Sequence, residues 1–151
     1  MRNVVADASV LLAFYLPAEP YKQAAMAVLK AFTEGRIRLV VPALAPYEFL
    51  NGLVRGVRGL RTGKRLPLEE ALAILQAFLA LRVEAVAVDG MEEEVLRTSA
   101  ECACSAYDAA YLALAKQHGW ELATGDERFS RAASGRFPSV RRVEDLAREL
   151  G

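Results

Sequence analysis

Four acidic residues stand where a carboxylate could take part in chemistry. Asp7 directly follows the short apolar run 3–6, and Asp126 comes soon after a second apolar run, 120–124. Glu48 and Asp108 each lie near the start of a segment with helical character. If these four carboxylates converge, they repel one another unless a cation fills the cluster. Because no His or Cys accompanies them, such an oxygen-only site favours a hard ion, Mg²⁺ or Mn²⁺.

An ion of this kind can activate water and neutralise the charge that develops on a phosphoryl group. Two ions, roughly 3.5–4 Å apart, could clamp both the attacking and the leaving oxygen. The sequence offers no other catalytic set: it contains no G-x-S-x-G, no P-loop and no G-x-G-x-x-G. A single histidine, His118, is too few for the usual triads. The residue types therefore point to metal-dependent hydrolysis.

Each acid also fits a purely structural role, and the sequence leaves this alternative open. Polar side chains before a helix accept hydrogen bonds from its first N–H groups, and acids in a first turn favour the helix dipole. The residues that could act only in this way are Asp7 or Ser9, Glu48, Ser105 with Asp108 as a capping box, and Thr124 before residues 127–133.

The segment 105–115, which reads SAYDAAYLALA, is apolar or small on nearly every face of a helix. A helix of this composition is usually buried. Burying the Asp108 carboxylate there is costly without a partner, and the nearest cations in the sequence are Arg97 and Lys116. Unless Asp108 is an exposed cap, its partner must come from elsewhere in the chain: an Arg, or a metal ion shared with other acids.

Short apolar runs alternate with helical patterns along the chain, which predicts a three-layer α/β/α fold with a central parallel sheet. We expect one domain, residues 1–151, with no linker or repeat. The expected strands are 3–6, 39–41, 86–88, 120–124 and 140–143. The expected helices are 10–16, 21–34, 46–57, 68–81, one capped by Asp89 with Glu92 and continuing to Cys102, then 105–118, 127–133 and 144–150.

Composition indicates a soluble globular protein, since 54% of the 151 residues are hydrophobic and 25% are charged. Nineteen basic residues balance nineteen acidic ones, so any signal for nucleic acid must be local. One dense basic stretch exists, and Arg55 within it lies seven residues after Glu48, about two helical turns along one face. The stretch is either a phosphate-binding rim or a solvated face. Its cations are Arg55, Arg58, Arg61, Lys64 and Arg65.

Cys102 and Cys104 are separated by one residue, a poor geometry for a disulfide, and they match no zinc-binding spacing. We expect them to be small apolar residues in a reducing compartment. The N-terminus leads directly into an apolar run without a signal peptide, and no run reaches membrane-spanning length. The expected location is the cytoplasm.

Four segments, in this order and spacing, resemble the PIN-domain family over essentially the whole chain. They are VADASVL at 5–11, YEFLN at 47–51, SAYDAAYLALA at 105–115 and LATGD at 122–126. The resemblance implies that Asp7, Glu48, Asp108 and Asp126 bind Mg²⁺ or Mn²⁺ and cleave RNA. Ser9, Asn51 and Thr124 match polar positions beside those acids.

In its length and in the lack of an appended domain, the chain further resembles the VapC-type toxin ribonucleases of toxin–antitoxin pairs. This resemblance implies a small antitoxin partner and a homodimer, with RNA as substrate. If the basic stretch is a phosphate-binding rim, Arg55 and Arg58 are its candidate RNA contacts.

Other functions are compatible with parts of the sequence. The chain could be a non-catalytic module that binds RNA or a protein through residues 55–65, or a PIN nuclease of RNA processing. The intact acids disfavour a binding module, because they repel phosphate. A phosphate receiver domain fits only at Asp7, and a haloacid-dehalogenase-like phosphatase would have a second Asp where Ser9 stands. RNA cleavage with Mg²⁺ or Mn²⁺, compared with EDTA, separates nuclease from binding module.

Overall fold

The computed structural model describes residues 1–17 and 20–151, and in these ranges five parallel strands form one sheet in the order β3-β2-β1-β4-β5. The central strand, β1, buries Val4 and Val5 completely, as expected of a strand covered on both faces. The strands are β1 (Arg2–Ala6), β2 (Ile37–Pro42), β3 (Glu84–Val86), β4 (Glu121–Thr124) and β5 (Val140–Arg142).

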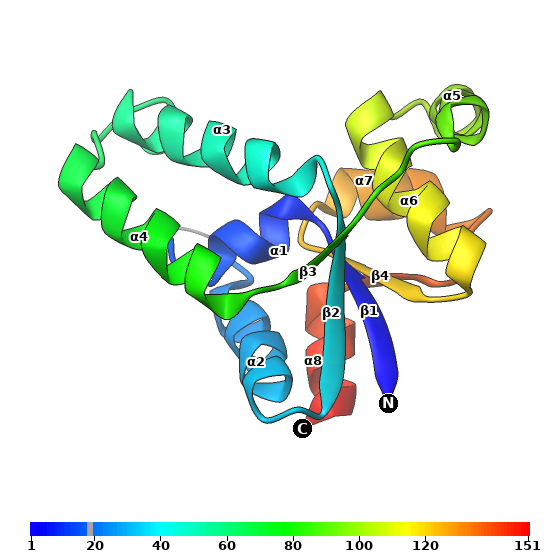
Figure 1. The fold of residues 1–151 in the computed structure, drawn as a ribbon, viewed down its shortest axis with the longest axis horizontal. Helices are drawn as coiled ribbons and strands as arrows, with labels where there is room; N and C mark the ends of the chain where they lie inside the picture. Colours follow the sequence, from blue (N-terminus) through cyan, green and yellow to red (C-terminus); the bar gives the residue numbers. More distant parts are fainter. Residues whose placement is uncertain (18–19) are drawn as a thin grey trace.

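Helices cover both faces of the sheet, so the predicted three-layer α/β/α fold is confirmed. On one side α6 packs against β1, β2 and β4, with α5 outside it and α7 nearby; α1, α2 and α8 lie on the other side (Figure 1). The helices are α1 (Ala8–Ala13), α2 (Lys22–Thr33), α3 (Ala45–Val57), α4 (Leu68–Leu81), α5 (Glu92–Cys102), α6 (Ala106–His118), α7 (Glu127–Ser134) and α8 (Val143–Leu150). None of the described helices is long and apolar enough to span a membrane.

Helix α6 confirms the prediction of a buried helix, since every residue from Ala109 to Ala115 is buried. Ser105 is its N-cap and accepts a hydrogen bond from the Asp108 N–H at 3.1 Å. Gly119 ends the helix with a φ of 67°, a left-handed conformation that glycine adopts without strain. Asp108 therefore lies in the first turn, directly before the buried middle of the helix.

Several element boundaries differ from those predicted. Strand β3 lies at 84–86 instead of 86–88, because its pairing with β2 sets Val40 opposite Glu84. The expected Asp89 cap of α5 is wrong: Met91 is the N-cap residue and makes no capping side-chain bond, while Glu92 accepts from the Gly90 N–H at 3.2 Å. Cys102 is buried and Cys104 half-buried, and both are free thiols.

Close packing of α1 against α3 fixes the helix that carries Glu48. A Cβ atom added at Gly52 of α3 would lie 2.4 Å from Leu12 Cδ1 of α1. We therefore expect Gly52→Ala to destabilise the protein by about 1–3 kcal/mol, the usual cost of overpacking. Thermal unfolding measures this effect. Gly135→Ala is the control, since nothing lies within 4 Å of its added Cβ; equal melting temperatures for the two variants would contradict the packing argument.

Candidate active site

The carboxyl ends of β1 and β4 bring the turns that carry Asp7 and Asp126 side by side. Ser9 connects the two turns, because its hydroxyl donates to Asp7 Oδ1 and accepts from the Gly125 N–H at 3.0 Å. The Asp7 N–H donates to the Ala123 carbonyl at 3.1 Å. Neighbouring β1 and β4 mark the point where the strand order changes direction, which is where open α/β sheets bind ligands.

Asp7 is only 5% exposed, and it is the N-cap of α1, where it accepts from the Val10 N–H at 3.3 Å. Burial raises its pKa from 3.8 to about 6, opposed by hydrogen bonds from Ser9, Thr124 and Val10. The nearby charge of Asp108 raises the pKa further. The capping role predicted as an alternative is thus real, but a simple cap is seldom this deeply buried.

Glu48 faces the interior from the first turn of α3. Burial raises its pKa, and the charge of Asp108 adds to the effect, whereas the neighbouring Tyr111 hydroxyl opposes it. Glu48 Oε1 and the Tyr111 hydroxyl are buried without meeting hydrogen-bond geometry with each other or with any other described group. Buried oxygens without partners are costly, so Glu48 is poised to accept a ligand.

Asp108 and Asp126 complete the acidic group. Asp108 is half-buried, and its pKa is raised by burial and by the charge of Asp126, against the hydrogen bond with Ser105. Asp126 is exposed and is the N-cap of α7, accepting from the Phe129 N–H at 3.0 Å. The expectation that Thr124 caps α7 is wrong, because Thr124 precedes the cap and accepts from the Asp126 N–H at 3.0 Å.

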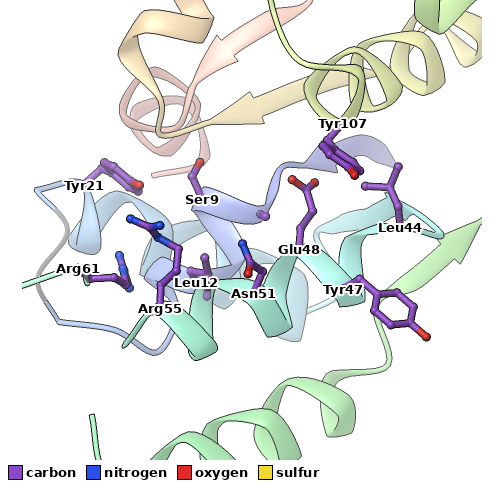
Figure 2. Close-up of a pocket in the computed structure, with 12 residues that line it drawn as sticks. Ser9, Leu12, Tyr21, Leu44, Tyr47, Glu48, Asn51, Arg55, Arg61 and Tyr107 are labelled. Atoms are coloured by element: carbon purple, nitrogen blue, oxygen red, sulfur yellow. The ribbon is translucent and has the colours of Figure 1, made fainter. Parts of the chain in front are cut away.

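A cleft of about 540 Å³ opens between α1, α3 and the start of α6; of the four acids, Glu48 lines it, whereas Asp7, Asp108 and Asp126 do not. Glu48 points into it, with Tyr107 at one end and Tyr21, Arg55 and Arg61 at the other (Figure 2). A smaller cleft of about 220 Å³ continues from Arg61. Its lining includes Thr62, Lys64, Arg65 and Glu70.

Of the residues predicted for the site, Ser9, Glu48, Asn51 and Arg55 line the cleft, while Arg58 does not. Helical geometry explains the difference. Arg55 comes seven residues after Glu48, nearly two full turns, and so lies on the same face of α3, whereas Arg58 comes ten residues after Glu48 and lies about 80° away from that face. Arg58 instead is the exposed C-cap of α3. Asp7 and Thr124 are buried, Asp108 is half-buried and Asp126 is exposed.

Sequence reasoning missed the two tyrosines that lie at the ends of the cleft. Tyr107 directly precedes Asp108, so its position beside an acid was a usable signal. The sequence around Tyr21 offered no such signal, because only the fold brings the Tyr21 ring against Gly125. A Cβ atom added at Gly125 would lie 2.3 Å from that ring. Arg61 was recognised as part of the basic stretch. Its direction towards the cleft was not predictable, because it lies in the turn after α3, where no helical periodicity indicates which way a side chain points.

The side chains of Asp7, Glu48, Asp108 and Asp126 have the chemistry of ligands for a divalent cation. The ligand atoms would all be carboxylate oxygens, one of them is buried without a partner, and three of the four acids have raised pKa values. Across the described part of the chain, however, no three His, Cys, Asp or Glu side chains are grouped closely enough to hold an ion as they stand. The metal centre therefore stays a prediction.

Comparison with known proteins agrees with the fold. The family model of the PIN domain matches residues 4–135, so the chain belongs to the PIN-domain family. Within that family it is of the VapC type: it is 34% identical over 144 residues to Ribonuclease VapC3 of Pyrobaculum aerophilum, covering 91% of this chain and 97% of that protein.

Two crystal structures share the architecture. PAE2754 of Pyrobaculum aerophilum matches with a TM-score of 0.71 and 26% identity, over 99% of this chain and 89% of that one. The toxin VapC20 of Mycobacterium tuberculosis, which cleaves the sarcin–ricin loop, matches with a TM-score of 0.60 and 18% identity, over 86% of this chain and 95% of its own. The second likeness concerns the fold alone.

Proposed function

We propose that this chain is the toxin of a VapBC-type pair, an endoribonuclease that uses Mg²⁺ or Mn²⁺ to hydrolyse RNA phosphodiester bonds in the cytoplasm. The observation that carries the proposal is geometric: the turns that hold Asp7 and Asp126 lie side by side where β1 and β4 end, joined through the Ser9 hydroxyl. The charge of Asp108 raises the pKa of both Asp7 and Glu48, and the charge of Asp126 raises that of Asp108.

In this proposal Asp7, Glu48, Asp108 and Asp126 hold the metal. Once bound, the ion would supply an activated water and charge neutralisation at the phosphoryl group. The chain's own residues prepare the site: the Ser9 hydroxyl keeps its proton directed at Asp7 Oδ1 and thereby orients that carboxylate. The guanidinium of Arg55, at the open side of the cleft, binds and orients a phosphate of the substrate.

Growth of a bacterial host tests the toxin role. Induced expression of the wild-type chain is expected to arrest growth, whereas Glu48→Gln, which removes one charge while keeping the side-chain shape, is expected to permit it. Glu69→Gln is the matched control, since Glu69 is exposed on α4, outside the cleft. Arrest by the wild type and by Glu48→Gln alike, at equal expression, would contradict the proposal.

Binding of single-stranded RNA at several salt concentrations tests the basic end of the cleft. A phosphate contact on single-stranded nucleic acid contributes about 0.7 to the slope of log affinity against log salt. We expect Arg55→Ala to flatten that slope by about this amount and Arg58→Ala to leave it nearly unchanged, because only Arg55 lines the cleft. Fluorescence titration measures both variants. Equal flattening would mean that RNA follows the outer face of α3 instead.

Partners follow from the same proposal. We propose a small antitoxin protein and a homodimer, supported by apolar side chains that α4 leaves exposed. Leu68, Leu72 and Leu79 are 61%, 49% and 53% exposed. Helices α3 and α4 project together beyond the sheet (Figure 1), so these leucines are accessible to another chain.

A further inference from the structure

Tyr107 is an exposed aromatic residue at one end of the cleft. Its side chain is 61% exposed, although it belongs to the first turn of α6, whose next turns are fully buried. In Figure 2 the ring points towards Glu48 and Leu44. Because the ring lies over the cleft beside Glu48, it can stack on a ligand that has an apolar face.

The two ends of the cleft differ in chemistry. Leu44 and Tyr107 make one end apolar and aromatic, whereas Arg55 and Arg61 make the other end basic, with Glu48 between them (Figure 2). Single-stranded RNA carries matching groups, because each nucleotide offers a base with a π-face and a phosphate with a negative charge. One aromatic end and one basic end therefore fit a base on one side of Glu48 and a phosphate on the other.

We propose that the cleft binds single-stranded RNA in a fixed register, with one base stacked on Tyr107 against Leu44 and the backbone on the other side held at Arg55 and Arg61. This inference rests on the proposed function, in which Glu48, between the two ends, belongs to the site that cleaves the backbone. Stacking is sequence-tolerant, so Tyr107 selects for an unpaired base and only weakly for its identity. A base held in a duplex has both faces covered and cannot stack there.

Fluorescence anisotropy in EDTA tests the inference without requiring cleavage. The probes are a short oligoadenylate and an abasic ribose-phosphate oligomer of the same length and charge. The wild-type protein is expected to bind oligoadenylate about 5- to 150-fold more tightly, the range of one aromatic stacking contact. Tyr107→Ala is expected to lose this preference, whereas Tyr107→Phe keeps the ring and the preference.

Tyr47→Ala is the matched control. Tyr47 lies on the rim of the same cleft and is 77% exposed, but its ring points away from the acids (Figure 2). It is expected to keep the wild-type preference. If wild type and Tyr107→Ala discriminate the two probes equally, the inference is overturned. Failure of the wild type to cleave any RNA in Mn²⁺ would instead overturn the proposed function, and the two failures are distinguishable.

Discussion

Replacing Asp7 by asparagine is expected to raise the melting temperature of the metal-free protein at pH 8 by roughly 6–12 °C. Burial holds the pKa of Asp7 at about 6 in the folded protein, against 3.8 for an ordinary aspartate. This separation corresponds to about 3 kcal/mol lost on ionising the buried carboxylate. For a chain of this size, each kcal/mol shifts the melting temperature by about 2–4 °C. Asparagine keeps an oxygen to accept from the Val10 N–H, so the helix cap survives.

The pH dependence gives the sign of the effect. Because the folded pKa of Asp7 is raised, its neutral form contributes full stability below pH 3.8, and that stability is lost as pH rises through about 6. Thermal melts of wild type and Asp7→Asn should therefore converge below pH 4, separate progressively between pH 4 and 6, and keep a constant difference above that. Asp89→Asn, in an exposed turn, is the control.

Manganese should narrow the gap between the two melting temperatures. At about 100 times its Kd, a ligand adds about 2.7 kcal/mol to the stability of the protein that binds it. Wild type should gain this amount, and Asp7→Asn should gain less because it lacks one charged oxygen. An Asp7→Asn protein that melts below wild type at pH 8 in EDTA would show that Asp7 is only a cap.

Loss of activity is the second large effect that we expect. Asp108→Asn should cleave RNA at least about 100-fold more slowly than wild type, because even residues that merely support metal ligands change affinity or activity 10- to 100-fold. The variant should fold, since the cap of α6 uses the Asp108 backbone N–H and not its carboxylate. Initial cleavage rates at saturating Mn²⁺ measure the effect.

Glu127→Gln is the matched control for this variant, because Glu127 is also a first-turn acid but is exposed and pairs with Arg131 at 2.6 Å. We expect it to cleave at the wild-type rate. A folded Asp108→Asn protein with wild-type turnover would remove Asp108 from the active site.

Sequence alone predicted the elements that packing and periodicity determine. The long apolar pattern of α6 and the helical period of α4 gave nearly correct bounds, because burial selects the same residues that define the pattern. Strand β3 was misplaced because it is a short, partly exposed strand at the edge of the sheet, where pairing rather than burial sets its bounds.

The acidic residues illustrate why the site could be predicted only in part from the sequence. Capping and chemistry are not exclusive: Asp7 and Asp126 both cap helices, and both lie where parallel strands end. The sequence posed these roles as alternatives, whereas a carboxylate can accept an N–H bond with one oxygen and keep the other for a ligand. The orientation of Tyr21 and Arg61 could not be predicted, because it depends on how turns far apart in the sequence approach each other.

The most direct test of the central claim is cleavage of a single-stranded RNA by the purified wild-type chain, followed by electrophoresis. We expect fragments with Mn²⁺ or Mg²⁺, none with EDTA, and recovery of cleavage when excess metal is added back. Cleavage that persists in EDTA and in an Asp108→Asn protein prepared in the same way, or intact RNA in every lane, would contradict the account of a metal-dependent nuclease built on Asp7, Glu48, Asp108 and Asp126.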